Sequence, residues 1–133
     1  MNSFLCQKRR VAMVIAGLLS GSPCVSAEQG YATWYSYDSC RREGNTGRTA
    51  SGALMRDEAL TCAHPALPFG THLIVHHHQQ SVICTVNDRG PGRGPRTRGV
   101  IVDLSPAAFS ELAPLGRGKI PVMVMQAPSL NTR

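Results

Sequence analysis

The chain has 133 residues, with 14 Lys and Arg against eight Asp and Glu, so its formal net charge is +6. This length allows one small domain and leaves no room for a second module. Aromatic residues make up only 5% of the chain and do not alternate with the basic ones, which argues against a nucleic-acid-binding surface.

The first 27 residues have the pattern of a secretory signal peptide. Basic residues 8–10 precede an apolar run over residues 11–19, and the small residues 25–27 form a cleavage signal. The apolar run is too short to span a bilayer as a helix. We therefore expect cleavage after Ala27 and export to the periplasm, the cell envelope or the medium, with no membrane span and a mildly basic remaining chain.

Cysteine usage fits an exported protein. A lipoprotein signal would place the lipid on Cys24, but Pro23 stands where such signals need a small flexible residue, so we do not expect an anchor. Three cysteines follow residue 27, which in an oxidising compartment predicts one disulfide and one free thiol. We prefer the pair Cys40–Cys62, because both flank loop-like segments, although sequence alone does not fix connectivity. Cys84 lies in an apolar run and would be a buried, unpaired side chain, or a route to a dimer if exposed.

Short runs rich in β-branched and aromatic residues recur between turn signals. They cover residues 31–36, 71–76, 81–86, 99–104 and 120–125. Such spacing is typical of an all-β barrel or sandwich. Only residues 77–80 separate the second run from the third, which suits a hairpin loop.

One short helix is expected after the fourth run. Ser105 is a good N-cap, Pro106 follows at the first helical position, and the segment ends before Pro114. Apolar side chains at helical spacing could cover one end of a barrel. The last residues, 128–133, have the composition of a frayed tail.

The segment VNDRGPGRGPRTRG, residues 86–99, places a single acid, Asp88, in a basic loop rich in Gly and Pro. Taken alone, Asn87-Asp88 ends a strand and Gly90-Pro91 forms a turn. The alternative is a general acid or base, held at the rim of a barrel and partly shielded by its neighbours. The residues by themselves leave both interpretations open.

Histidines occur at two places that could carry chemistry. His64 sits in LTCAHPALPFGT, whose prolines and glycine exclude regular structure; it could orient a carboxylate or a substrate hydroxyl, or satisfy backbone groups. His76, His77 and His78 are consecutive, and side chains on a strand alternate between faces, so the three cannot all bind one ion. We expect a solvated hairpin tip there, with no metal and no cofactor.

Five motifs, taken together, resemble the double-psi β-barrel domain of the RlpA (rare lipoprotein A) family, the septal-ring lytic transglycosylases of bacterial cell walls. The motifs are GYATWYS from Gly30, TASG from Thr49, LTCAHPALPFGTHLIV from Leu60, VNDRGP from Val86 and VIVDLSPAAF from Val100. The resemblance implies an all-β fold, a six-stranded double-psi β-barrel with one or two short helices, over residues 28–127. It also implies endolytic cleavage of peptidoglycan strands between N-acetylmuramic acid and N-acetylglucosamine, leaving 1,6-anhydromuramoyl ends.

The resemblance also assigns catalytic roles. The acid of the DRGP motif, to which catalysis is attributed in the family, falls on Asp88, and the histidine of AHPxLPFG falls on His64, which would orient Asp88 or the substrate. The family commonly carries Glu directly after TASG, where this chain has Ala53. A hydrolase usually needs two carboxylates, whereas in a lytic transglycosylase the sugar's own C6 hydroxyl attacks and one acid can suffice. Asp57 and Glu58 could reach into the groove instead.

Further residues are candidates for binding the glycan. Trp34 or Tyr35 could line the groove, because aromatic faces pack against sugar rings, with core packing as the alternative. Arg89 could pair with carboxylates of the wall, or with Asp103 to brace the loop. The expected substrate-binding set is completed by two residues of the TASG motif, Thr49 and Ser51.

The main rival is a non-catalytic, glycan-binding and wall-loosening module similar to expansins, which share the barrel and an equivalent acid. The absent Glu at Ala53 favours this rival. An interaction protein or inhibitor on the same scaffold has no specific feature in its favour, since fold does not settle function. In each case we expect a monomer, with peptidoglycan strands as partner and no nucleic acid.

Overall fold

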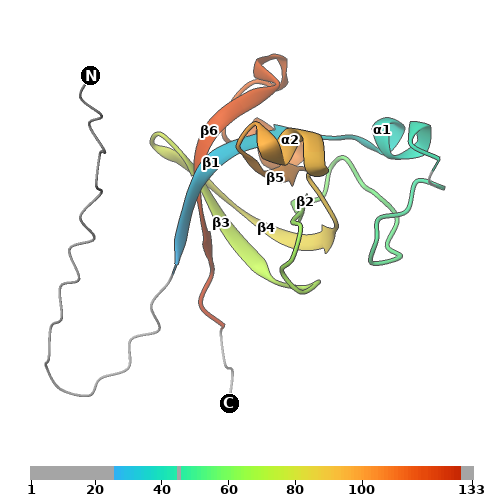
Figure 1. Ribbon diagram of the computed structural model, residues 1–133, viewed down its shortest axis with the longest axis horizontal. Helices are drawn as coiled ribbons and strands as arrows, with labels where there is room; N and C mark the ends of the chain where they lie inside the picture. The colour runs from blue at the N-terminus through green and yellow to red at the C-terminus, as the bar shows by residue number, and fades with distance from the viewer. Residues whose placement is uncertain (1–25, 45, 130–133) are drawn as a thin grey trace, which may run out of the picture.

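The computed structural model describes residues 26–44 and 46–129 (Figure 1). The expected signal peptide up to residue 25, with Cys24, lies outside the described residues, as do residues 130–133 of the expected tail. No helix in the described ranges is long and apolar enough to cross a membrane.

Six strands and three short α-helices make up the described chain. The strands are β1 (Ala27–Trp34), β2 (Thr61–Ala63), β3 (His72–His77), β4 (Gln80–Asp88), β5 (Val100–Leu104) and β6 (Lys119–Gln126). The helices are α1 (Tyr37–Arg42), α2 (Arg93–Thr97) and α3 (Pro106–Ser110), followed by a 3₁₀ turn, η1 (Leu115–Arg117). The expected all-β fold with six strands is confirmed, with one more helix than expected.

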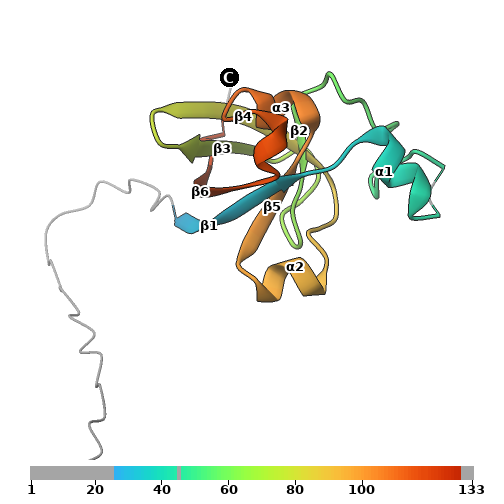
Figure 2. The same cartoon turned by 90° about the horizontal axis from the view of Figure 1, so that it is seen from above.

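The strands close into a barrel in the order β1-β5-β2-β4-β3-β6. β1–β5 and β2–β4 pair in parallel, and the remaining neighbours are antiparallel. This is the topology of a double-psi β-barrel. α1 projects from one side of the barrel, and α2 lies beside β5 (Figures 1 and 2). α3 packs against β1, β4 and β5 and covers one end (Figure 2).

Alternating side chains of the strands fill the barrel. In β4 the buried positions are Val82, Cys84 and Val86, while Ile83 between them is exposed. This period of two is the signal that predicted the strands. Phe109 of α3 is fully buried and joins the same core. The predicted hairpin is confirmed, since β3 ends and β4 begins on either side of a two-residue turn.

Three elements escaped prediction. β2 lies in the segment expected to be irregular, before Pro65 and Pro68, because its three residues are held by two neighbouring strands and not by local preference. The first run ends as a strand at Trp34, and Ser36 then caps α1 in a capping box with Ser39. α2 forms within the Gly, Pro and Arg loop.

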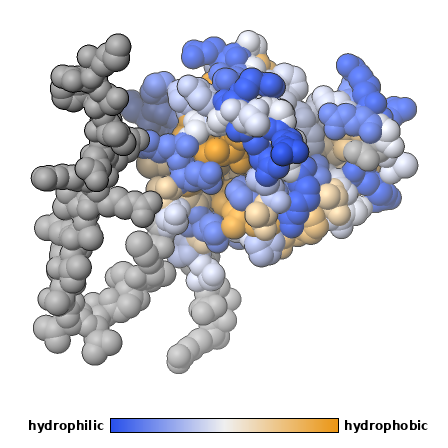
Figure 3. All heavy atoms as spheres, in the orientation of Figure 1, coloured by the Kyte–Doolittle hydropathy of each residue, from blue (hydrophilic) through white to orange (hydrophobic). Residues whose placement is uncertain are grey.

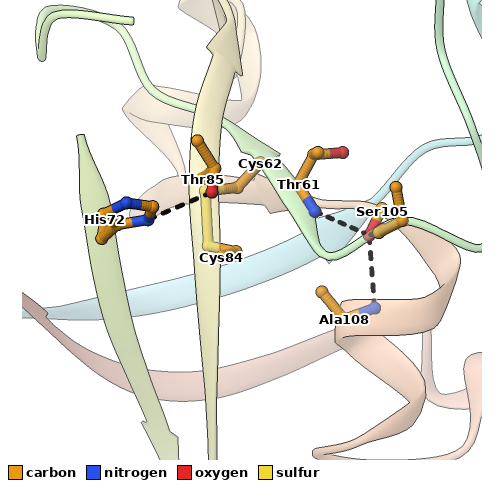
Figure 4. Close-up of a disulfide and its surroundings, with 8 residues drawn as sticks. Thr61, Cys62, His72, Cys84, Thr85, Ser105 and Ala108 are labelled. Atoms are coloured by element: carbon orange, nitrogen blue, oxygen red, sulfur yellow. Dashed lines mark hydrogen bonds between the residues drawn. A yellow bond between two sulfur atoms is a disulfide. The ribbon is translucent and has the colours of Figure 1, made fainter. Parts of the chain in front are cut away.

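Ser105 caps α3 as predicted, although the α-helix ends earlier than expected, at Ser110. The Ser105 hydroxyl accepts from the amides of Ala108 (3.2 Å) and Thr61 (3.3 Å), and donates to the carbonyl of Ala59 (2.6 Å) (Figure 4). A fully buried hydroxyl is thereby satisfied three times, and α3 is tied to β2.

The disulfide joins Cys62 to Cys84, with 5.9 Å between their Cα atoms, so the expected pair Cys40–Cys62 is wrong (Figure 4). Cys62 and Cys84 lie on the neighbouring strands β2 and β4, and both side chains face the barrel interior. Cys40 is instead a free, buried thiol on α1, 3.5 Å from the carbonyl oxygen of Arg48. The inward alternation of Val82, Cys84 and Val86 is the sequence signal that could have favoured Cys84.

Hydrophilic residues surround an apolar area near the middle of the face drawn in Figure 3. The large hydrophobic side chains that the described chain exposes are Tyr31, Leu54, Leu60, Phe69 and Ile83. They come from separate segments, and single exposed apolar residues are ordinary on a protein surface.

Candidate functional site: an acidic cleft

A cleft of about 360 Å³ opens where β1, β2 and β4 end. Its walls are built by segments far apart in the chain. The lining residues are Tyr35, Ser39, Cys40, Glu43, Ala63, Asp88, Arg89, Gly90, Gly92, Pro95 and Asp103. The barrel therefore gathers the DRGP motif, α1 and β5 around one space.

Asp88, the last residue of β4, is half-buried in the wall of this cleft. Its Oδ2 accepts a hydrogen bond from the Tyr35 hydroxyl (3.0 Å), and its Oδ1 accepts from the amides of Ala50 (2.8 Å) and Arg89 (2.8 Å). Burial, reinforced by the charge of Asp88, raises the pKa of Tyr35 well above its ordinary value, so its hydroxyl remains a donor. Three donors hold one carboxylate in one orientation.

The TASG motif supplies one of these donors. Thr49 and Ala53 close the loop, since the Thr49 amide donates to the Ala53 carbonyl (2.8 Å), and the Ser51 amide docks the loop onto the Asn87 carbonyl (3.2 Å). The hydroxyls of Thr49 and Ser51 lie 2.9 Å apart and bond to each other. The motif thus brings the Ala50 amide to the acid, and contact of Thr49 or Ser51 with substrate stays a prediction.

His64 acts on this region through the backbone. Its Nδ1 accepts from the amides of Ala66 (3.1 Å) and Leu67 (3.0 Å), while its own amide donates to the Asp88 carbonyl (3.2 Å). Burial lowers the pKa of His64, with Glu28 opposing and the Arg89 charge adding to the decrease. A neutral ring with an unprotonated Nδ1 agrees with these bonds. His64 does not line the cleft, so its predicted contact with substrate remains a prediction.

Arg89 holds the same loop from the other side. Its Nη1 donates to the carbonyls of Leu67 (2.7 Å) and His64 (3.3 Å), and its guanidinium carbon lies 4.0 Å from the centroid of the Phe69 ring. Of the two alternatives, the brace is present, but its partners are carbonyls and an aromatic ring and not Asp103. Pairing of Arg89 with carboxylates of the wall stays a prediction. The guanidinium is already engaged, because three groups of the loop surround it.

The two aromatic candidates for glycan binding, Trp34 and Tyr35, lie in different places. Tyr35 lines the cleft, whereas the indole nitrogen of Trp34 donates to the Leu115 carbonyl (3.0 Å) and its ring packs against the core. Trp34 therefore fits the alternative of packing in the core, whereas Tyr35 lies where a ligand could contact it.

The acids suggested as substitutes for the missing Glu lie elsewhere. Asp57 accepts a hydrogen bond from the Tyr37 amide (2.7 Å), and Glu58 is 3.7 Å from Arg56 in an exposed ion pair. Neither lines the cleft.

Asp103 of β5 is the cleft residue that the sequence analysis considered only as a partner for Arg89. The Thr33 hydroxyl donates to its Oδ1. Burial raises the pKa of Asp103, the Thr33 bond opposes this, and the charges of Glu43 and Asp88 add to the increase. One signal was available in the sequence: an acid stands between the buried Val102 and Leu104 of the strand.

The His-rich hairpin is not simply a solvated tip. His77 is buried, and its Nδ1 lies 2.7 Å from the Pro121 carbonyl, so that part of the expectation is wrong. His78 follows in the turn with φ of 52° and is exposed. In the described part of the chain no group of three His, Cys, Asp or Glu residues is placed to hold a metal ion.

The fold and the site define a double-psi β-barrel protein with three acidic residues, Glu43, Asp88 and Asp103, lining one cleft. The chain belongs to the lytic transglycolase family, whose sequence pattern matches residues 27–124. It is similar to the probable endolytic peptidoglycan transglycosylase RlpA of Nostoc sp., with 41% identity over 99 residues, which cover 72% of this chain and 24% of that protein. The endolytic peptidoglycan transglycosylase RlpA of Pasteurella multocida is 35% identical over 94 residues, covering 69% and 29%.

The chain thus spans less than a third of the length of these relatives. Among solved structures, the Streptomyces papain inhibitor superposes with a TM-score of 0.60 and 23% identity, covering 77% of this chain and 96% of the inhibitor. The apo expansin of Clavibacter michiganensis gives a TM-score of 0.60 and 23% identity, covering 78% and 52%. At such identities the likeness concerns the fold alone.

Proposed function

We propose that the chain is an endolytic lytic transglycosylase that cuts peptidoglycan strands between N-acetylmuramic acid and N-acetylglucosamine. The observation that carries this proposal is Asp88, held by three donors in the wall of a cleft. Membership of the lytic transglycolase family supports the reaction type, and the names of the RlpA relatives support peptidoglycan as the substrate.

The reaction needs few catalytic groups from the protein. The C6 hydroxyl of the muramic acid residue attacks its own anomeric carbon, the bond to the leaving sugar breaks, and a 1,6-anhydro end forms without water. In the simplest scheme one carboxyl group gives a proton to the leaving oxygen and then takes one from the hydroxyl. Asp88 lines the cleft and can exchange protons with a bound strand.

The proposed setting is the cell envelope. Peptidoglycan lies outside the cytoplasm, and the expected signal peptide would export the chain to the periplasm or beyond. We propose a monomer that needs no cofactor and binds no nucleic acid. Residues 28–127 would be the RlpA-like domain, followed by a tail over residues 128–133.

The test is mass spectrometry of the products released from intact and from peptide-stripped glycan strands. The native protein should release 1,6-anhydro ends, and Asp88→Asn should reduce the yield by about 100-fold or more, the usual scale for loss of a proton-transfer group. Glu58→Gln is the matched control, because Glu58 is an exposed acid outside the cleft. Equal yields from native protein and Asp88→Asn would refute the role of Asp88.

A second candidate is favoured by Ala53, which stands where the family commonly carries Glu. In this alternative the cleft binds a glycan and loosens its contacts without cutting, as expansins are thought to do. Native protein that sediments with the strands but releases no anhydro ends from either substrate would establish this reading and exclude the lyase.

A further inference from the structure

We propose that Asp103 is a second catalytic carboxyl group: it donates the proton to the leaving glycosidic oxygen, while Asp88 accepts the proton of the attacking C6 hydroxyl. The inference rests on the proposed transglycosylase activity and deepens it by assigning the two proton transfers to two residues.

The strand register places the two acids on either side of one small residue. Ala63 of β2 pairs with Asp88 of β4 on one side and with Asp103 of β5 on the other. Neighbouring strands lie about 4.8 Å apart, so the two acids stand about 10 Å apart at the backbone. From this backbone spacing the two side chains can bring their carboxyl groups to the separation, on the order of 5 to 10 Å, that glycosidases with two carboxyl groups use around the scissile bond. Ala63 lines the cleft between the two acids.

The Asp103 carboxyl group is turned toward that cleft. Thr33 donates to Oδ1, and Oδ2 bonds to none of the described residues. Oδ2 lies beside Gly90, where an added Cβ would approach it to 3.3 Å. Gly90 has φ of 144°, a conformation that other residues rarely adopt, and its lack of a side chain keeps Oδ2 open to the cleft.

The two acids have different surroundings. Both oxygens of Asp88 act as acceptors for three donors, so in this arrangement Asp88 has no proton directed at a ligand. Asp103 receives one hydrogen bond, and burial raises its pKa, which favours the protonated form. Asp103 therefore has the surroundings of a proton donor, and the donors around Asp88 hold it as an oriented acceptor.

Asp103 forms no ion pair with a cation among the described residues. The guanidinium of Arg89 is engaged by the Leu67 and His64 carbonyls. The charged and titratable groups that face Asp103 in the cleft are Asp88 at the end of β4, Arg89 after it, Tyr35 after β1, Cys40 on α1 and Glu43 after α1. The carboxylates among these oppose ionisation of Asp103.

The reaction balances with these two residues. The proton on Asp103 passes to the leaving oxygen as the bond between that oxygen and the anomeric carbon breaks. The C6 oxygen forms the new bond to the same carbon, and its proton passes to Asp88. One proton then returns from Asp88 to Asp103 through solvent, which restores both groups. The second acid thus comes from β5, and Ala53 in the TASG loop needs no replacement by Asp57 or Glu58.

The first test compares Asp103→Asn with native protein and with Glu58→Gln. Release of 1,6-anhydro ends should fall by about 100-fold or more, as for loss of a general acid. Sedimentation with glycan strands and cooperative thermal unfolding should persist, since Asn keeps the shape and the Thr33 contact.

The second test uses Thr33→Val and reads the pH profile of product release. Activity should fall as the pH rises through the pKa of Asp103, because the acid must be protonated. The Thr33 bond lowers that pKa, so its loss should move the alkaline limb to higher pH. A merely structural role for Asp103 would not move the limb, and Thr33→Val does not depend on Asp103→Asn folding.

The outcomes separate the two proposals. Active native protein with an inactive, folded Asp103→Asn variant and a shifted limb in Thr33→Val supports Asp103 as the acid. Active native protein with an equally active Asp103→Asn variant, or an unmoved limb in Thr33→Val, overturns this assignment and leaves the lyase standing. Native protein without any product overturns both.

Discussion

The barrel interior and the cleft at its end are built from opposite kinds of side chain. The interior gathers apolar side chains from alternate strand positions and a disulfide, Cys62–Cys84, with almost no polar group among them. The cleft gathers carboxyl groups, a tyrosine hydroxyl and the free, buried thiol of Cys40 around open space. Burial of apolar surface stabilises the first region, whereas burial of a carboxyl group such as Asp103 costs stability in the second. The stability supplied by the interior therefore offsets the cost of burying carboxyl groups in the cleft.

The largest effect should come from removing an interior side chain. Ile120 is fully buried and Ile83 is 55% exposed, so the same substitution tests both environments. Ile120→Ala should lower the free energy of unfolding by about 2–5 kcal/mol through lost transfer energy and a cavity, and Ile83→Ala by less than about 1 kcal/mol. Chemical denaturation measures both, and similar losses would contradict the described register.

The disulfide should rank next. It closes a segment 22 residues long, and linking such a segment restricts the unfolded chain by about 3 kcal/mol in the loop-entropy description. Replacing Cys62 and Cys84 together by Ala should lower the denaturation midpoint accordingly. Cys40→Ala is the control, because Cys40 forms no disulfide. A larger loss in the control than in the double variant would mean that the cysteines pair otherwise.

Asp103→Asn should raise the stability at neutral pH, whereas the two preceding changes lower it. Burial raises the pKa of Asp103 from its ordinary 3.8, so the folded state binds the proton more tightly than the unfolded state. Its contribution is therefore full below pH 3.8 and is lost as the pH rises through the folded pKa. The variant should melt higher than native protein at neutral pH, with the difference narrowing toward pH 3. Thermal scans across this range decide it, and a lower melting point at neutral pH would contradict the burial cost.

The smallest effect should come from His64. Burial lowers its pKa below the ordinary 6.5, so protonation in the folded state is disfavoured and would remove Nδ1 as acceptor for Ala66 and Leu67. The stability that it contributes is present above pH 6.5 and is lost as the pH falls through the folded pKa. His64→Asn keeps an acceptor that does not titrate, so its melting temperature should fall less between pH 7 and pH 5. Parallel slopes for variant and native protein would refute this account.

The two regions also differ in how far the sequence predicts them. Alternating apolar residues located five strands, and Ser105 with Pro106 located α3, because these signals act between near neighbours. β2 and the pair Cys62–Cys84 depend on which strands become neighbours, which no local pattern reports.

In the cleft, the motif resemblance located Asp88, and the structure adds the donors that hold it. Asp103 escaped because its one local signal, an acid inside an apolar strand, does not tell which space the side chain faces: it enters the cleft through the pairing of β5 with β2 on the far side of Ala63. For Arg89 the sequence left open whether it pairs with wall carboxylates or braces the loop, and the carbonyl partners of its brace follow from the shape of that loop and not from residue types.

Closure of the barrel limits how this protein can recognise a polymer. Each described strand has a hydrogen-bonded neighbour on both sides, so the backbone offers no free edge to which an extended chain could add. A long partner would instead bind across the end of the barrel, through contacts with side chains and loop amides. Selectivity for one kind of strand would then change with a few loop residues, while the barrel beneath them stays the same.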